Sequence, residues 1–266
     1  MAQEKWLVED AKTIDIGLVR NLKVSLIAGK VDIIGHDEPT ARVEVHSVSG
    51  KALKVSMDGD TLEIDHPQMS WDNFLDVFKS FTGTAKADVS IMVPRDIALK
   101  FGVISATALI SGLTEDASIS TVSGDVVIDN IYGDLQLNAV SGEIAVRNHY
   151  GEIAVKTISG DVAATGEIMK FSGNTVSGDV YVDIAGAPDE VTVSTVSGTV
   201  TTRLAAGVAA QYRINTVSGR LQLDDTQVTG VRGGYTGKYG ELDKTWLEFK
   251  ANTVSGNISV VHAVGA

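Results

Sequence analysis

The chain has 266 residues, of which 44% are hydrophobic but only 6% aromatic, and its 27 glycines outnumber its four prolines. The net charge of −12 at pH 7 argues against a nucleic-acid backbone as a partner, since binding one requires a basic surface. The absence of cysteine excludes disulfides, thiolate metal sites and cysteine catalysis.

The N-terminal residues, MAQEKWLVEDAKTIDIGLV, lack the basic region and apolar run of a signal peptide. No stretch approaches the roughly 18 to 20 apolar residues of a membrane-spanning helix. We therefore expect a cytoplasmic protein without a transmembrane segment, and an exported or membrane-associated one if the sequence is truncated.

A glycine-centred repeat, regular in residues 101–224, has weaker copies around Gly29 and Gly59. These copies predict less regular N-terminal coils over residues 1–100.

Residues 68–82 interrupt the glycine-centred repeat. Trp71, Phe74 and Phe78 follow helical spacing, with polar residues on the other side, and so predict a short helical insertion. Such a helix can cover the open end of a stack of strands, which is the interpretation we favour. The alternative is a docking helix, in which these three aromatic residues contact a partner.

Residues 101–224 repeat the phrase VSG or ISG, at intervals of 18 to 21 residues from Gly124 onward, with apolar residues alternating after each glycine. The alternation predicts half-buried strands, and the period predicts coils of about 18–21 residues that pair in parallel with their neighbours. Glycine suits the corners because the chain turns sharply there and a stacked corner leaves little room for a Cβ atom. The predicted corner glycines are Gly124, Gly142, Gly160, Gly178, Gly198, Gly219 and Gly256.

Equivalent residues of stacked coils should form rows. We expect the residue before each Ser-Gly pair to point inward, as in Val176, Val196 and Val254, and the preceding threonines to point outward. Asn138, Asn174, Asn215 and Asn252 should align so that their amides bridge successive coils.

The rows of polar residues do not predict a catalytic or metal-binding site. Acids after the glycines, such as Asp161 and Asp179, are expected to be solvated; a weak cation site is the alternative. The serines have no G-x-S-x-G motif, and the five histidines have no metal-ligand spacing. We therefore predict no catalytic residue, no metal ligand and no cofactor.

Residues 225–247 form a Gly-rich stretch that predicts a loop insertion, either a long loop or a hairpin, before a final coil at 248–266. The stretch fails the phosphate-loop pattern because Arg232 and Tyr239 stand at required glycine and hydroxyl positions. Its candidate partner contacts are Arg232, Tyr235, Lys238 and Tyr239, although solvation of a surface loop is the simpler interpretation.

The repeats resemble a known family of bacterial β-strand-repeat proteins, the "putative adhesin" or Toastrack-like domains. The resemblance is carried by Ser123–Val126, Ser141–Ile144, Ser159–Val162, by VSIMVPRDIAL at 89–99 and by ARVEVHSVSG at 41–50. It covers nearly the whole chain and implies a binding or scaffolding surface, in some relatives linked to envelope-stress assemblies. It implies no catalytic residues.

We predict an all-β protein: a single elongated parallel β-solenoid domain, 1–266, with the short helical insertion. The predicted function is a non-enzymatic interaction scaffold with a protein partner and no nucleic acid. The alternatives are a cell-surface adhesin that binds glycan and a self-assembling, bactofilin-like element, which would be a homo-oligomer.

Overall fold

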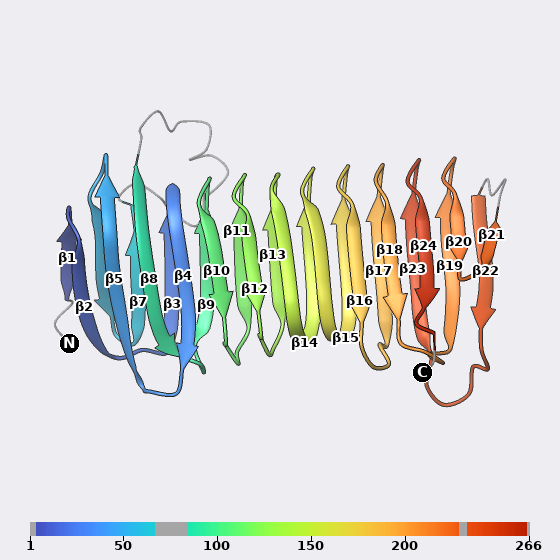
Figure 1. The fold of residues 1–266 in the computed structure, drawn as a ribbon, viewed down its shortest axis with the longest axis horizontal. Helices are drawn as coiled ribbons and strands as arrows, with labels where there is room; N and C mark the ends of the chain where they lie inside the picture. The colour runs from blue at the N-terminus through green and yellow to red at the C-terminus, as the bar shows by residue number, and fades with distance from the viewer. Residues whose placement is uncertain (1–3, 67–84, 229–232, 265–266) are drawn as a thin grey trace. The chain divides into compact units, whose positions relative to one another are not determined.

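The computed structural model describes residues 4–66, 85–228 and 233–264, and every regular element in these ranges is a β-strand (Figure 1). The all-β, solenoid-like prediction is confirmed. Within the same ranges, no helix is long and apolar enough to cross a membrane. The predicted helix at 68–82, with Trp71, Phe74 and Phe78, lies outside the described residues. The strands belong to two compact units, Met1–Gly133 and Asp134–Ala266.

The N-terminal unit (Met1–Gly133) arranges its strands in two rows. Their bounds are β1 (Lys5–Val8), β2 (Lys12–Leu18), β3 (Asn21–Leu26), β4 (Ala28–His36), β5 (Thr40–Ser49), β6 (Leu53–Asp58), β7 (Thr61–Asp65), β8 (Lys86–Pro94), β9 (Ala98–Val103), β10 (Thr107–Ser111), β11 (Ala117–Thr121) and β12 (Val126–Asp129). One row runs β1-β6-β7-β3-β9-β11 and the other β2-β5-β8-β4-β10-β12. In each row the first two pairings are antiparallel and the others parallel. The first strands of each row are therefore exceptions to the mainly parallel pairing expected from the sequence.

The C-terminal unit (Asp134–Ala266) also has two rows. Its strands are β13 (Leu135–Ala139), β14 (Glu143–Thr157), β15 (Asp161–Thr175), β16 (Val180–Ile184), β17 (Glu190–Thr195), β18 (Val200–Leu204), β19 (Ala210–Thr216), β20 (Leu221–Leu223), β21 (Thr226–Val228), β22 (Gly233–Tyr239), β23 (Leu247–Thr253) and β24 (Ile258–His262). β14 and β15 are long enough to contribute to both rows. One row runs β13-β14-β15-β17-β23-β19-β22 and the other β14-β15-β16-β18-β24-β20-β21.

The spatial order of the coils differs from their order in the chain. The final coil, β23 and β24, lies between the coil of β17 and β18 and the coil of β19 and β20. The stretch predicted as a loop, 225–247, contains β21 and β22, which pair antiparallel with β20 and β19. The last strands in sequence are therefore held between two neighbours.

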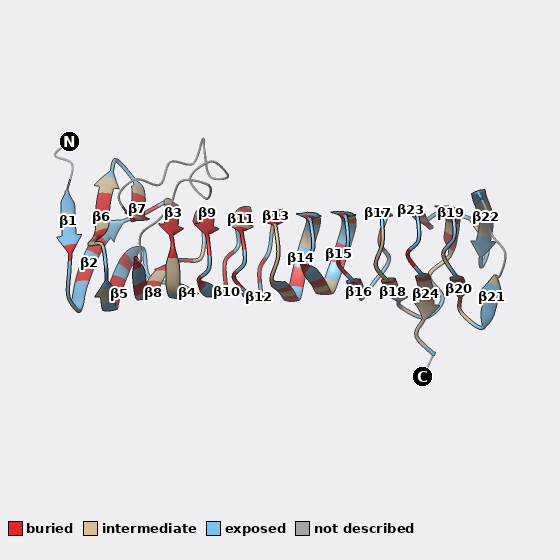
Figure 2. Cartoon of the chain, turned by 90° about the horizontal axis from the view of Figure 1, so that it is seen from above, coloured by how far each residue is buried: buried red, intermediate tan, exposed pale blue. Residues whose placement is uncertain are grey.

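The core follows the alternation seen in the sequence. In β17 the side chains of Val191, Val193 and Thr195 are buried and the intervening ones are partly exposed (Figure 2). In the same unit, Tyr212 and Phe249 are buried on adjacent strands and make an edge-to-face contact, with ring centroids 6.0 Å apart. Burial raises the pKa of the Tyr212 hydroxyl.

The corner glycines are required mainly by close approach between coils. A Cβ atom on Gly178 would lie 2.1 Å from the carbonyl oxygen of Gly160, and one on Gly256 would lie 2.2 Å from that of Gly198. Positive φ is a further requirement at Gly142 and Gly198, where φ is 105° and 130°. The predicted reason, lack of space at stacked corners, is confirmed.

We predict that Gly178→Ala lowers the free energy of unfolding by about 2 to 4 kcal/mol, because the added methyl overlaps backbone that cannot move without disturbing the next coil. Gly17→Ala is the control, since no atom lies within 4 Å of the added carbon and its φ is not positive. Urea denaturation of both variants measures the difference. Equal stability of the two variants would contradict the close-approach explanation.

His66, at the end of β7, is a buried titratable group of the N-terminal unit. Its Nδ1 accepts a hydrogen bond from the Ile27 backbone N–H at 3.2 Å, so this nitrogen carries no proton. Burial lowers the pKa of His66 from 6.5 to about 4, and the charge of Lys51 adds to the effect.

Because the folded-state pKa lies below the unfolded one, the native state binds fewer protons between these values. We predict that stability is full above about pH 6.5 and falls by up to about 3 kcal/mol as the pH drops towards 4. Denaturation at a series of pH values should show a shallower slope for His66→Gln than for the wild type. His46→Gln, at an exposed position, is the control; an unchanged slope for His66→Gln would refute the assignment.

Candidate functional site

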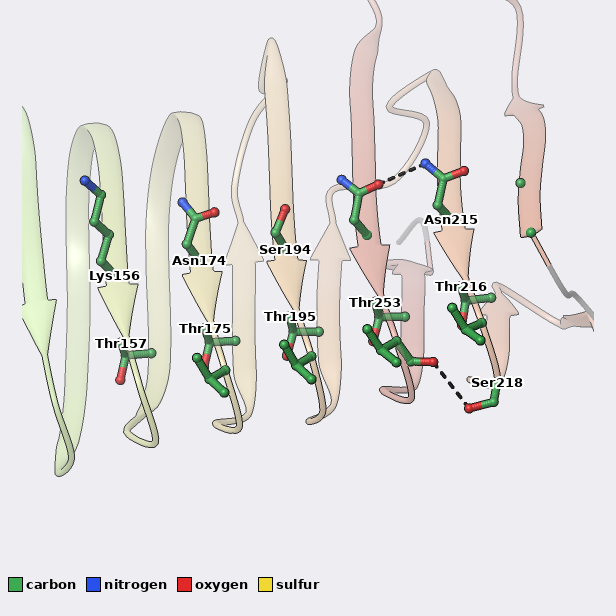
Figure 3. A pocket seen from close by; sticks show the side chains of 17 residues that line it. Lys156, Thr157, Asn174, Thr175, Ser194, Thr195, Asn215, Thr216, Ser218 and Thr253 are labelled. Carbon is green, nitrogen blue, oxygen red and sulfur yellow. Dashed lines mark hydrogen bonds between the residues drawn. The ribbon is translucent and has the colours of Figure 1, made fainter.

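A groove of about 940 Å³ crosses β14, β15, β17, β23 and β19 of the C-terminal unit and ends at Gly233 and Gly234 of β22 (Figure 3). We call it the rung groove. A threonine row lies between a polar row and a valine row. The polar row contains Lys156, Asn174, Ser194, Asn252 and Asn215; the threonine row contains Thr157, Thr175, Thr195, Thr253 and Thr216; and the valine row contains Val176, Val196, Val254 and Val217.

The threonine row is buried, which contradicts the outward orientation expected from the sequence. Each threonine ends a strand in phase with the core residues before it, as Thr195 does after Val193. The Thr253 hydroxyl oxygen accepts the backbone N–H of Gly256 at 2.8 Å. Equivalent bonds join Thr157 to Gly160, Thr175 to Gly178 and Thr216 to Gly219. The threonines therefore satisfy backbone donors at the corners.

The valine row is exposed, and the prediction that it points into the core is wrong for this unit. Val176, Val196 and Val254 are each 48% exposed, and Val217 is 62% exposed. The reason is the two-residue period of the strand: because threonine points inward, the next residue points outward. The result is a continuous row of branched aliphatic side chains in contact with solvent.

The polar row is almost uncharged. Asn215 donates from Nδ2 to Oδ1 of Asn252 at 2.9 Å, which confirms a bridge between stacked amides for this pair. Asn174 and Asn252 lie on either side of Ser194 along the row. Lys156, at the β14 end, is exposed and is the charged residue that lines the groove.

The corner serines are engaged by the neighbouring coil. Ser177 donates its backbone N–H to the carbonyl oxygen of Ile158 at 2.9 Å and its hydroxyl to the same oxygen at 3.4 Å. Ser218 and Ser255 repeat this arrangement with Val254 and Val196. These hydroxyls therefore join neighbouring coils.

The corner acids have a structural role that sequence reasoning missed. Asp161 Oδ1 accepts the backbone N–H of Asp179 at 2.9 Å, and Asp179 Oδ1 accepts that of Thr199 at 2.6 Å. These carboxylates therefore join successive coils. Among the described residues, no group of three or more His, Cys, Asp or Glu side chains could hold a metal ion.

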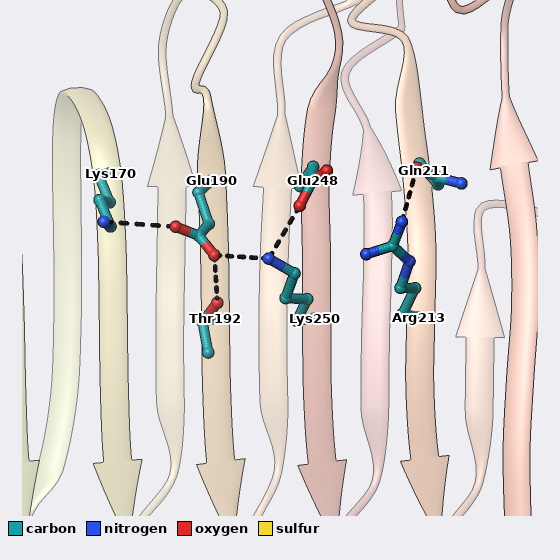
Figure 4. A network of polar contacts seen from close by, with 7 residues as sticks. All are labelled: Lys170, Glu190, Thr192, Gln211, Arg213, Glu248 and Lys250. Carbon is teal, nitrogen blue, oxygen red and sulfur yellow. Dashed lines mark hydrogen bonds and ion pairs between the residues drawn. The ribbon is translucent and has the colours of Figure 1, made fainter.

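Beside the groove, charged side chains form a ladder on the same strands (Figure 4). Glu190 contacts Lys250 at 2.8 Å and Lys170 at 3.3 Å, and Lys250 also contacts Glu248 at 2.8 Å. The hydrogen bond from Lys250 lowers the pKa of both carboxylates, and the same bonds raise the pKa of Lys250. The two lysines and two glutamates of this ladder compensate one another, while Arg213 on β19 donates to the side-chain oxygen of Gln211 at 3.4 Å.

The predicted partner contacts at 225–247 lie on β22, except Arg232, which is outside the described residues. Tyr239 stacks on the His262 ring, with centroids 3.7 Å apart, and Lys238 contacts Glu241 at 3.8 Å. A Cβ atom on Gly237 would lie 2.6 Å from the Tyr235 hydroxyl, so that ring covers the glycine. Tyr235 and Tyr239 thus pack against their own unit, while Lys238 is exposed.

His262 secures the last strand of the unit. Its Nδ1 lies 2.9 Å from Asp224 Oδ1, and its Nε2 lies 3.0 Å from the carbonyl oxygen of Val208. The His262 backbone N–H also donates to Asp224 at 2.7 Å. These contacts connect the end of β24 with the residues that follow β18 and β20.

Comparison with known proteins gives one family. The family model described as Toastrack DUF4097 matches residues 18–261. No curated protein matches the chain.

Solved structures of low identity match most of the chain. A "putative lipid binding protein" from Parabacteroides distasonis is 13% identical, with a TM-score of 0.49, and the match covers 96% of this chain and 97% of the other. A "putative adhesin" from Bacteroides fragilis is 12% identical, with a TM-score of 0.44 and coverage of 94% and 97%. A "putative cell adhesion protein" from Clostridium sporogenes is 13% identical, with a TM-score of 0.32 and coverage of 96% and 100%.

We predict that Thr253→Val lowers the free energy of unfolding by about 1 to 2 kcal/mol, because the Gly256 N–H loses a buried acceptor while the side-chain shape is kept. Thr201→Val, at a partly exposed position of β18, is the matched control. Chemical denaturation measures both. A loss for Thr253→Val no larger than that of the control would show that the threonine row is dispensable for the corners.

Proposed function

Because the chain belongs to the Toastrack DUF4097 family, we propose that it is a non-enzymatic interaction scaffold whose recognition surface is the rung groove. The groove is an exposed, regular and mainly aliphatic surface in a chain that otherwise carries many charges. Contiguous exposed apolar residues commonly mark sites of interaction. The exposed valine row is the observation that carries the proposal.

The chemistry of the groove supports binding without catalysis. Its described lining contains threonine, serine, asparagine, glycine, valine and Lys156, with neither a histidine nor a carboxylate. General acid–base catalysis requires a positioned group that exchanges protons, and nucleophilic catalysis requires a nucleophile beside its base. The threonine hydroxyls are occupied with corner N–H groups.

The regular spacing of the groove favours an elongated partner. Neighbouring strands lie about 4.8 Å apart, so equivalent contacts recur at that interval along the groove. The protein partner expected from the sequence stays a prediction, and Lys238 on the bounding strand β22 is exposed outside the groove lining. Cytoplasmic location, adhesion at a cell surface, self-assembly and a single elongated solenoid through the whole chain stay predictions.

The test is affinity capture from the native host with the wild type and the double variant Val196→Asp/Val254→Asp. Both valines are half exposed, so we expect the variant to fold while two carboxylates obstruct the groove. Captured proteins are identified by mass spectrometry, and co-purifying small molecules are identified after extraction.

We expect at least one species to be retained by the wild type and reduced at least tenfold in the double variant. Tyr181→Asp, at an exposed position of β16, is the control and should retain it. Thermal unfolding of all three proteins verifies that they fold. An identical set of retained species for wild type and double variant would contradict the rung groove as the recognition surface.

A further inference from the structure

We propose that the occupant of the rung groove is a long-chain fatty acid, with its alkyl chain on the valine row and its carboxylate across the threonine row at Lys156, the β14 member of the polar row. This inference rests on the proposed function and specifies the chemistry of the ligand. It is argued from the lining, length and charge of the groove.

The lining favours an unbranched alkyl chain. Val176, Val196 and Val254 stand at equivalent positions of adjacent strands and are equally exposed, so the valine row has the same chemistry at each step. A ligand that follows this row needs a uniform apolar surface along its length, which a polymethylene chain provides. Contact with the row removes apolar surface of both molecules from water.

The polar row is less suited to a saccharide. Sugar rings are commonly held by stacking on aromatic side chains, and no aromatic residue is among the described lining residues of the groove. Asn215 and Asn252 already hydrogen-bond to each other, which reduces their capacity to bind hydroxyl groups. The same neutral row does not exclude a methylene chain, which requires no hydrogen bonds.

The length of the groove corresponds to a common acyl chain. From β14 through β15, β17 and β23 to β19 the floor spans about 19 Å at about 4.8 Å per strand spacing. An extended alkyl chain advances about 1.3 Å per carbon, given a C–C bond near 1.5 Å, so about 15 to 16 carbons fill this distance. The volume of about 940 Å³ leaves room for one such chain together with water.

The charge of the groove gives the ligand a direction. Lys156 is the charged residue among the described residues of the lining, it stands at the β14 end of the polar row, and its ammonium forms no ion pair within that part of the chain. A carboxylate placed there gains a charge-assisted hydrogen bond. The other end is bounded by Gly233 and Gly234, which carry no side chain and so leave that end of the groove open to a ligand.

The first experiment measures binding of saturated fatty acids of 8, 12, 16 and 20 carbons to the full chain. Titration calorimetry is performed below the critical micelle concentration of each acid. Because the open groove covers one side of the alkyl chain, we expect affinity to rise about twofold per methylene, half of the free energy of full burial. The rise should level off beyond about 16 to 18 carbons, where the groove ends. Absence of binding by the 16-carbon acid, or an equal affinity for all lengths, would overturn the proposal.

The second experiment uses variants and a neutral analogue. Val196→Ser/Val254→Ser should weaken binding of the 16-carbon acid about tenfold, while Met169→Ser, which removes an exposed apolar side chain outside the groove lining, should leave it unchanged. Lys156→Gln should weaken the acid about three- to tenfold and leave the 16-carbon alcohol unaffected. Equal effects of Lys156→Gln on acid and alcohol would overturn the placement of the carboxylate.

The two proposals fail in different ways. If the acids do not bind but capture from the host still depends on Val196 and Val254, the fatty-acid proposal is wrong and the scaffold proposal stands. If the acids bind and Val196→Ser/Val254→Ser has no effect, the ligand lies elsewhere and this proposal is overturned. If neither acids nor captured species depend on the valines, both proposals are wrong.

Discussion

The close approach of backbone at the stacked corners is the constraint on which the other features depend. A side chain on Gly178 or Gly256 would meet the carbonyl oxygen of the adjacent corner. With glycine in place, the coils approach closely enough for Ser177 to bond a carbonyl of the neighbouring coil and for Asp161 to accept a backbone N–H. The strands between the corners then stay in register and pair in parallel. The corner is thus the element that repeats, and the strands follow from it.

The buried threonine connects the corner with the candidate site. Its hydroxyl satisfies a glycine N–H that the core would otherwise leave without a partner, as Thr253 does for Gly256. Since this requires threonine to point inward, the following valine must point outward. The same bond forms at Thr157, Thr175 and Thr216, and Thr195 of β17 donates to the Ser197 carbonyl oxygen of its own corner, so the exposed valine row follows from the way the corners are closed. The fold therefore presents a surface suited to an apolar ligand without any additional strand or loop.

Charged side chains in the C-terminal unit form ion pairs and hydrogen bonds with neighbouring strands and corners. Lys250 joins Glu190 and Glu248, and the corner carboxylates Asp161 and Asp179 accept backbone N–H groups. Exposed ion pairs of this type contribute little to stability individually. Beside the groove Lys170 and Lys250 are paired with Glu190 and Glu248, and Lys156 is the charged side chain among the described lining residues. The acidic character of the whole chain is therefore compatible with binding of an anion at this one position.

The sequence by itself determined the repeat, the all-β solenoid-like fold and the need for glycine at the corners, because a strand's two-residue period and the space at a corner are local properties. It did not reveal the groove. Whether threonine or valine points inward depends on a hydrogen bond across the corner, and both residues fit a strand equally well. Only the tertiary structure decided that β23 lies between β17 and β19 and that 225–247 supplies the strands β21 and β22. The physical reason is that parallel pairing joins residues far apart in the chain, and near-identical coils carry no local signal of which neighbour they will pair with.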